Sequence, residues 1–365
     1  MSRDPHDEAV TSVMDGSAWE AFCRQLLEAG RLVISAAPDD PFDRAEGLRY
    51  VSRVAAYGLT NFIERSDPAT SVVTEGLPKI GGDNPDYLYA SAPLSADFEY
   101  RLRGNAGDAR YLGVGTYTGD VGTADGLKLS GYLNGSEIDM GADGSFEIAV
   151  SLAEKPGNWL PMLEGTTQLM TRQTLLDRKS QRPAVFEIER TDGNGGVRPL
   201  APERFAAQLE RTGEYVSGAI AQFLEWTKSF AARPNSIDPL DPELAAGAQG
   251  DPFTHYFGGY YDIAPDEALV VELVPPKCDY WNLQLCNHWL ESLDYGNHVV
   301  HVNDHTAVSE DGKTVRIVVA HRDPGVANWL DTAGHLRGCM VLRQVGTPDP
   351  HTPACRVVRY EDLST

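Results

Sequence analysis

The chain of 365 residues lacks several features that would place it quickly in a class of proteins. No apolar run approaches the ~18 residues that span a membrane, and the N-terminal residues MSRDPHDEAV lack the basic-then-apolar pattern of a signal peptide. Basic charge is also scarce, because 31 Lys and Arg stand against 53 Asp and Glu and give a net charge of −22. A field of that sign repels nucleic-acid phosphates and anionic lipid. We therefore expect an acidic, cytoplasmic protein with no nucleic acid and no membrane among its partners.

Cysteine is rare and irregularly spaced. The chain has five cysteines, an odd number, and no C-x-x-C pair. Free buried thiols suit a reducing compartment, whereas a disulfide framework or a structural zinc site needs paired spacings. The sequence therefore predicts five reduced thiols at Cys23, Cys278, Cys286, Cys339 and Cys355.

Motifs of the common enzyme classes are missing as well. The segment GVGTYTG at 113–119 differs by one residue from the dinucleotide-binding fingerprint and does not lie between a strand and a helix. There is no G-x-S-x-G elbow, no phosphate-binding loop and no H-E-x-x-H. These absences disfavour a serine hydrolase and a nucleotide-dependent enzyme, and no cofactor is expected, although a divalent metal stays open.

Hydrophobic periodicity predicts helices followed by strands, twice over. Helical spacing covers 17–35 and 43–65 in the first half and 202–229 in the second. Alternating, half-buried strands follow each helical part, as in DFEYRLRG and GSFEIAVSL. We expect a disordered tail at 1–15 and strand-rich regions at 84–190 and 256–359. A long loop is expected at 233–252, between the helix of the second half and its strands.

The two halves also match in sequence. KPGNWLP at 155–161 resembles DPGVANWLD at 323–331, Asp143-Gly144 matches Asp311-Gly312, and Arg172 matches Arg343 in the same order. This order predicts a tandem duplication. The expected fold is mainly β with α segments, a tandem duplicated β-sandwich (double jelly-roll-like) whose halves are each preceded by amphipathic helices, with domains at 16–198 and 199–365.

The second half carries a family resemblance. Tyr280-Trp281, the segment NHWLESLDY at 287–295 and the segment DPGVANWLD at 323–331 are similar to the C-terminal signature of the bacterial domain of unknown function 1214, often paired with domain of unknown function 1254. The resemblance is specific over about 260–345 and looser over 84–200. It implies two jelly-roll-like units and no settled activity, cofactor or catalytic residue.

Duplication separates scaffold from chemistry, because a residue kept in both halves serves the shared fold. By this test the Asn-Trp pairs at 158–159 and 328–329 are structural: Asn suits a tight turn and Trp supplies a large buried anchor. His321, Asp323 and Asp331 occur in the second half alone, so we expect them to be the acid–base group. The alternative is that the two aspartates cap the turn.

Polar side chains in the strand around Trp281 suggest a binding pocket. Asn282 and Gln284 alternate with apolar residues, and amides are disfavoured in mid-strand unless they have a role. The expected substrate-binding residues are Asn282, Gln284, Asn287, Trp289 as a stacking platform, Asp294 and Arg343. Core packing is the competing explanation for the tryptophans.

Five of the nine histidines fall within 288–321. A metal site built from His301, His305 and His321 is a weaker alternative, since imidazole binds several divalent metals. The competing interpretation of these histidines is that they are polar groups on a solvent-facing or interfacial strand.

The sequence therefore favours an enzyme, a hydrolase, lyase or isomerase that uses acid–base chemistry on a sugar-like or small hydroxylated substrate. The first alternative is a non-catalytic ligand-binding or assembly module, and the second is a metal-dependent enzyme. The expected partners are a small-molecule substrate and further copies of the chain in a homo-oligomer.

Overall fold

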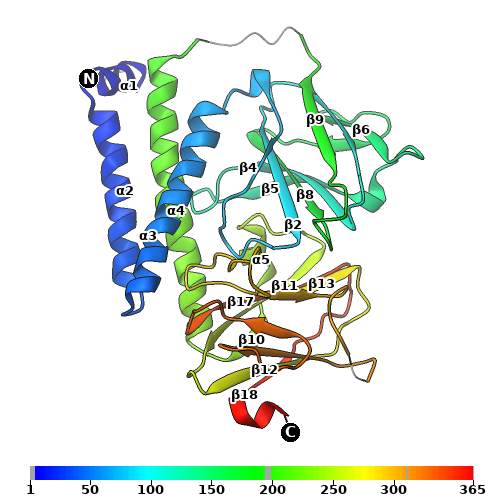
Figure 1. Cartoon of the computed structure of the whole chain (residues 1–365). Coiled ribbons are helices and arrows are strands. Elements are labelled where there is room, and N and C mark those ends of the chain that lie inside the picture. Colours follow the sequence, from blue (N-terminus) through cyan, green and yellow to red (C-terminus); the bar gives the residue numbers. More distant parts are fainter. Residues whose placement is uncertain (1–4, 194–198, 310, 365) are drawn as a thin grey trace. The chain divides into compact units, whose positions relative to one another are not determined.

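Helices precede each set of strands in a computed structural model of the chain, which describes residues 5–193, 199–309 and 311–364 (Figure 1). The helices are α1 (Pro5–Met14), α2 (Ser17–Ala36), α3 (Pro41–Leu59), α4 (Pro202–Ala231) and the short α5 (Pro242–Ala246). A π-helical turn at Thr60–Glu64 extends α3. Short 3-10 turns lie at Pro68–Thr70, Gly135–Glu137 and Tyr360–Ser364. The three predicted helical segments are confirmed. No helix among the described residues is both long enough and apolar enough to cross a membrane.

Two predictions about irregular segments are wrong. Pro5–Met14 form α1 rather than a disordered tail, while residues 1–4 lie outside the described part of the chain. The expected loop at 233–252 contains strand β10 (Ser236–Pro239) and helix α5. Its prolines lie where these elements tolerate them: Pro239 ends the strand, and Pro242 starts the helix, where a missing N–H costs nothing.

The first half forms a sandwich of two sheets around one core. The larger sheet has the order β1-β2-β8-β4-β5 and the smaller one β7-β6-β3-β9. Buried residues of both sheets, such as Leu102, Val114 and Leu160, form the core between them. The strands are β1 (Thr74–Glu75), β2 (Tyr87–Pro93), β3 (Tyr100–Asn105), β4 (Tyr111–Thr118), β5 (Lys128–Asn134), β6 (Ser145–Ser151), β7 (Trp159–Pro161), β8 (Thr166–Thr174) and β9 (Val185–Arg190).

The second half repeats this topology strand for strand. Its sheets have the orders β10-β11-β17-β13-β14 and β16-β15-β12-β18, so each strand has a counterpart nine places earlier. Leu283, Ile317 and Leu342 belong to the core between these two sheets. The strands after β10 are β11 (Thr254–Asp262), β12 (Glu267–Leu273), β13 (Tyr280–Leu285), β14 (His301–Asn303), β15 (Val315–Ala320), β16 (Trp329–Asp331), β17 (Arg337–Val345) and β18 (Ala354–Arg359). The duplicated β-sandwich is confirmed.

The shared Asn-Trp pairs occupy equivalent places. Asn158 precedes β7, which pairs in parallel with β6, and Asn328 precedes β16, which pairs in parallel with β15. Each asparagine amide donates to the backbone oxygen of the strand residue beside it, Glu147 or Arg316, at 3.0 and 2.9 Å. Both tryptophans are half-buried, so they are weaker core anchors than the sequence suggested.

Chain contacts divide the molecule into two compact units. Unit 1 contains residues 1–36, 47–78 and 86–221, and unit 2 contains 37–46, 79–85 and 222–365. The boundary lies within α4 rather than at 198/199, where residues 194–198 are outside the described part. Unit 2 thus holds the second sandwich together with two short segments from earlier in the chain, and these segments supply part of the site described below.

Candidate functional site

Strand β13 places its amides on the face of the sheet that points away from the core. Trp281, Leu283 and Leu285 belong to the core, and because side chains alternate along a strand, Asn282 and Gln284 lie on the opposite face. Both amides are nevertheless fully buried. A polar layer therefore lies inside unit 2, on the outer side of its larger sheet.

The amides of this layer bind one another and Arg343 from β17. Arg343 Nη1 donates to Gln284 Oε1 at 2.7 Å, and a second guanidinium nitrogen of Arg343 donates to the Gly82 oxygen. Asn282 Nδ2 donates to Asn84 Oδ1 at 3.1 Å, and Gln284 Nε2 donates to the Asp83 backbone oxygen at 2.7 Å. The partners of these amides within unit 2 are thus Arg343 and the segment 79–85, and their expected role in substrate binding stays a prediction.

Segment 79–85 is also fastened to the loop that follows β13. Asp83 accepts from the Ser292 backbone N–H at 2.9 Å and from its hydroxyl at 2.7 Å. Burial raises the pKa of Asp83, although the bonds from Ser292 oppose the rise. Lys79 donates to the Ser292 oxygen at 2.6 Å and the Leu293 oxygen at 2.9 Å. These bonds hold segment 79–85, which we call the strap, against the rest of unit 2.

A second buried group combines carboxylates with an imidazole; we call Glu46, Asn287, Glu291 and His335 the acid–imidazole cluster. His335 Nε2 lies 2.9 Å from Glu46 Oε2. Asn287 Nδ2 donates to Glu46 Oε2 at 3.1 Å and to Glu291 Oε2 at 2.9 Å. Since Glu46 is 6% exposed, His335 6% and Glu291 0%, these charges have left bulk water almost completely.

Hydrogen-bond chemistry fixes where the proton of His335 lies. Its Nδ1 faces the Thr332 backbone oxygen at 2.9 Å, and a carbonyl only accepts, so Nδ1 carries a hydrogen. The contact between Nε2 and Glu46 therefore needs one further proton, held by either partner. Burial lowers the pKa of His335, but the hydrogen bond and charge of Glu46 outweigh it and raise the pKa above its ordinary value. An imidazolium–carboxylate pair is favoured.

The surroundings of the cluster are also titratable. Burial raises the pKa of Asp43, with Asp40 adding to the rise and the charge of His335 opposing it. The Tyr260 hydroxyl lies 2.8 Å from His288 Nδ1, and burial raises the pKa of Tyr260 strongly. Phe42 lies over the imidazole, with ring centroids 4.9 Å apart, and is itself 48% exposed. A half-exposed aromatic side chain thus covers part of the His335 imidazole.

The residues expected to be the acid–base group bond to other groups of the fold and, among the described residues, not to one another. His321 Nε2 faces the Ile263 oxygen at 3.0 Å and Nδ1 faces the Thr332 hydroxyl at 2.9 Å, so both ring nitrogens are engaged within the fold. Asp323 accepts from the Gly325 N–H, and Asp331 accepts from the Ala333 N–H, both at 2.8 Å. These two are turn-capping bonds, and the other carboxylate oxygen of Asp331 lies 2.7 Å from His298 Nδ1. A catalytic role for the three residues stays a prediction, and the geometry favours the capping alternative.

Two expected binding residues are also held within the fold. Trp289 is 1% exposed, and its indole donates to the Asp43 backbone oxygen at 2.8 Å, so its rings are enclosed rather than offered to a ligand. Asp294 closes a turn by accepting from the Gly296 N–H at 3.1 Å and the Asn297 amide at 2.8 Å. Both serve as scaffold in this conformation.

The metal alternative finds no support in the geometry. Within 5–193, 199–309 and 311–364, no three or more His, Cys, Asp or Glu side chains are placed to hold a metal ion. His301 lies on β14, His305 follows it, and His321 is bonded elsewhere as described. The prediction that these three histidines form a ligand set is wrong.

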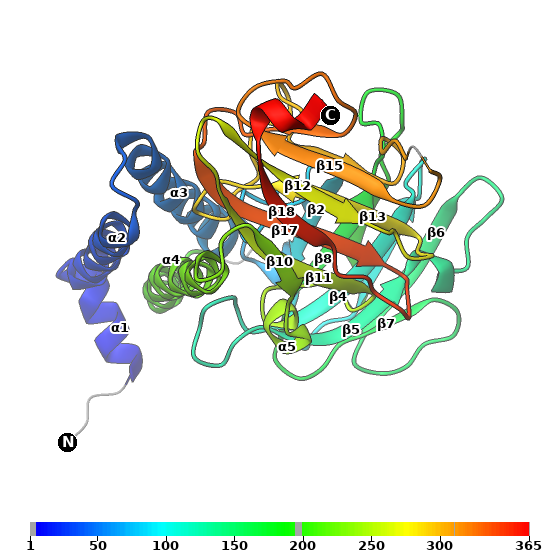
Figure 2. The same cartoon turned by 90° about the horizontal axis from the view of Figure 1, so that it is seen from below.

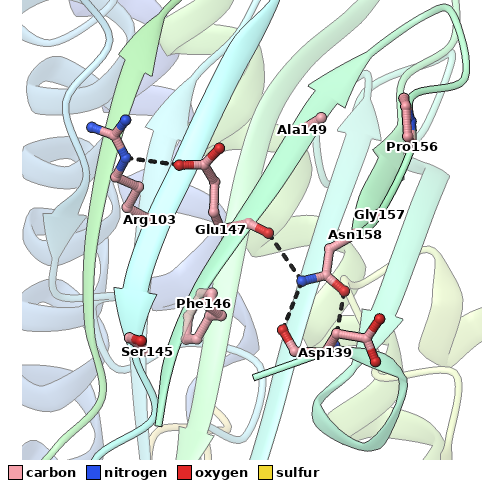
Figure 3. A pocket seen from close by; sticks show the side chains of 9 residues that line it. All are labelled: Arg103, Asp139, Ser145, Phe146, Glu147, Ala149, Pro156, Gly157 and Asn158. Carbon is pink, nitrogen blue, oxygen red and sulfur yellow. Dashed lines mark hydrogen bonds and ion pairs between the residues drawn. The ribbon is translucent and has the colours of Figure 1, made fainter. Parts of the chain in front are cut away.

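A hollow of about 510 Å³ lies on unit 1, lined by Arg103, Asp139, Glu147, Asn158 and neighbouring residues (Figure 3). Arg103 is paired in register with Glu147, and their side chains bond at 3.0 Å. The equivalent strands of unit 2 pair Glu272 with Arg316, the same charges exchanged. Oppositely charged residues at facing positions in both halves are typical of a solvated sheet face. The hollow therefore ranks below the private, buried cluster of unit 2.

Sequence reasoning missed Glu46, Glu291 and His335. His335 lies four residues after Asp331, the end of the segment DPGVANWLD, and Glu291 lies within NHWLESLDY. Glu46 had no local signal, because it lies 289 residues from His335 in the chain. The one available clue was that the loop between β7 and β8 contains no histidine, whereas the loop between β16 and β17 contains His335.

Comparisons with known proteins give a relative without an assigned activity. No family model and no curated protein matches the chain. A solved structure from Vibrio parahaemolyticus shares the fold, with a TM-score of 0.51 at 12% identity over 85% of this chain and 96% of that one. An uncharacterized protein from Burkholderia cenocepacia is 38% identical over 97% of this chain and 100% of its own, with a TM-score of 0.94. The chain belongs to the same family as this Burkholderia cenocepacia protein.

Proposed function

We propose that the chain is an enzyme whose second half performs acid–base chemistry on a small hydroxylated substrate, by hydrolysis, elimination or isomerisation. The observation that carries the proposal is the contact between His335 Nε2 and Glu46 Oε2, which are 2.9 Å apart and out of bulk water. Proton transfer of this kind requires a donor and an acceptor within hydrogen-bond reach.

The energetic cost of the cluster supports a role beyond folding. Burying two carboxylates and an imidazole costs several kcal/mol per ion before pairing offsets it, and an apolar core of the same volume is often as stable. Proteins concentrate perturbed pKa values of this kind at functional sites. Because the corresponding loop of the first half lacks a histidine, the shared fold does not require this one.

Each member of the cluster has a distinct part in the proposed chemistry. His335 donates the proton to a leaving or carbonyl oxygen, and Glu46 accepts the proton of a substrate hydroxyl. Asn287 holds both carboxylates through one amide nitrogen, and Glu291 keeps that amide oriented. Displacement of the half-exposed Phe42 side chain admits the substrate.

Two further expectations join the proposal. The family-like segments NHWLESLDY and DPGVANWLDTAGH contribute Asn287, Glu291 and His335, which supports a shared role with the domain of unknown function 1214. All five cysteines are free, which supports a cytoplasmic location.

Turnover of a compound panel tests the function. Sugar lactones, nitrophenyl glycosides and small hydroxy acids are incubated with the wild type and with His335→Gln, Glu46→Gln and His321→Gln, and products are followed by NMR. Both cluster variants should lower turnover of the converted compound by about 10²-fold or more, the range for a positioned acid–base group. His351→Gln is the matched control, since His351 is bonded to the Val274 oxygen at the surface of unit 2.

Circular dichroism must show that each variant is folded. Loss of turnover in His321→Gln with full turnover in His335→Gln would return the site to the sequence-predicted residues. Full turnover in both cluster variants would contradict the proposed chemistry.

A further inference from the structure

Helix α2 carries more apolar surface than its own unit covers. Phe22, Ala29 and Val33 form its buried face, and the Gln25 side chain lies against Gly213 of α4. The α2 ribbon lies beside α4, on the side away from the strands of unit 1 (Figures 1 and 2). A second apolar stripe runs along α2 beside its buried face. It consists of Trp19, Cys23, Leu27, Gly30 and Ile34.

The second stripe is regular and exposed. Its spacings of four, four, three and four residues keep it within an arc of about 80° at 100° per residue. Trp19 is 55% exposed, Leu27 53% and Ile34 41%, and Cys23 is also exposed. This is the heptad-like seam with which one helix packs on another.

Gly30 lies in the middle of α2, where no neighbouring atom of the described chain requires a glycine. Glycine in mid-helix costs about 0.5–1 kcal/mol relative to alanine. A Cβ built at Gly30 meets no atom within 4 Å, so nothing within the described chain requires the small residue there. Close approach of another helix would require it, and Gly30 lies within the exposed stripe.

The charges beside the stripe identify the second helix. Glu20, Arg24, Glu28 and Arg31 follow one edge of it, alternating in sign. In an antiparallel pair, residues whose numbers share a constant sum face each other. Glu20 with Arg31 and Arg24 with Glu28 have sums of 51 and 52, while Trp19 with Ile34 and Cys23 with Gly30 both have 53. Because these sums differ by no more than two, one antiparallel alignment places opposite charges against each other and also places the two apolar stripes against each other.

We propose that α2 pairs in antiparallel with α2 of a second copy of this chain. Trp19 lies against the partner's Ile34, and the space beside Gly30 accommodates the larger side chains opposite. Four ion pairs flank the seam, two from each copy by symmetry. In a parallel pair the charged edge of each helix would lie beside the opposite, apolar edge of its partner, so these four ion pairs would not form.

Sedimentation equilibrium of the full chain tests the association. Leu27→Glu introduces a charge at the centre of the seam and should give a monomer at concentrations where the wild type is dimeric. The control is Leu163→Glu, since Leu163 is a similarly exposed leucine of unit 1 outside α2 and its replacement should leave the dimer intact. A monomeric wild type at all concentrations would overturn the proposal, as would a Leu27→Glu protein that stays dimeric.

Cross-linking tests the direction of the pair. Gly30→Cys places a thiol opposite the partner's Cys23, and mild oxidation should give a covalent dimer under non-reducing electrophoresis, with Cα atoms within the 7 Å that a disulfide allows. Gly30→Ser should give none. A disulfide dimer of the wild type through Cys23 alone would show a parallel pair and contradict the antiparallel arrangement.

Discussion

Single residues of unit 2 owe their chemistry to partners that come from distant parts of the chain. His335 Nδ1 contacts the backbone oxygen of the nearby Thr332, and its Nε2 contacts the carboxylate of Glu46 in α3. The first contact fixes the tautomer and the second sets the charge. His321 contacts the Thr332 hydroxyl and the Ile263 oxygen instead, so only His335 of these two imidazoles faces a carboxylate.

The Glu46–His335 pair makes stability depend on pH. Because the folded state raises the pKa of His335 above about 6.5, protonation favours folding. The contribution is complete below that value and is lost as the pH rises through the folded-state pKa. We expect the free energy of unfolding, measured in urea across neutral pH, to fall more with rising pH in the wild type than in His335→Gln. Equal pH dependence in the two proteins would mean that His335 is not charged in the fold.

Two tryptophans separate burial from hydrogen bonding. Trp289 is enclosed and Trp329 is half-buried, yet each indole donates to a backbone oxygen, that of Asp43 or Ala320. Trp289→Ala should lower the free energy of unfolding by about 3–5 kcal/mol, the usual cost of emptying a buried aromatic site. Trp329→Ala should cost clearly less. Equal losses in urea denaturation would show that the indole hydrogen bond, not burial, dominates.

Elements of the fold follow rules that are visible in the sequence where they are local. Alternation predicted the strands, and helical spacing predicted α2 and α4, because each pattern reflects one buried face. The short β10 and α5 were missed, since four or five residues are too few to show a period. The strap at 79–85 was missed for another reason: its bonds to β13 and β17 are long-range and leave no periodic trace.

The turn before β16 depends on backbone conformation as well as bonds. Asn328 has a φ of 54°, and its side chain accepts from the Val308 N–H and donates to the oxygens of Val308 and Arg316. Loss of three bonds in Asn328→Ala should cost about 2–3 kcal/mol. Asn328→Gly should cost about 1 kcal/mol less, because glycine has no steric penalty at this φ. A glycine variant less stable than the alanine variant in thermal unfolding would contradict this account of the turn.

At the scale of the whole molecule, duplication makes the chain its own control. Matched segments such as NWLP and NWLD predicted two equal sandwiches, and the strand orders agree throughout. In the structure, the first half has Gly113 and Gly115 on the equivalent strand β4 where the second half has Asn282 and Gln284, so these amides are also private to the second half. The comparison of the two halves did not find the acid–imidazole cluster, because a cluster made by three separate segments has no signature in any one of them.

Histidine NMR of unit 2 tests the central claim, that the acid–imidazole cluster is the reactive group. The nine imidazoles are isotope-labelled, and His335→Gln identifies the signal of His335. We predict that His335 titrates above about 6.5, that Glu46→Gln lowers its pKa, and that the compound converted by the wild type shifts its signal. A titration at or below the ordinary value, with the compound shifting His321 and not His335, would contradict the account.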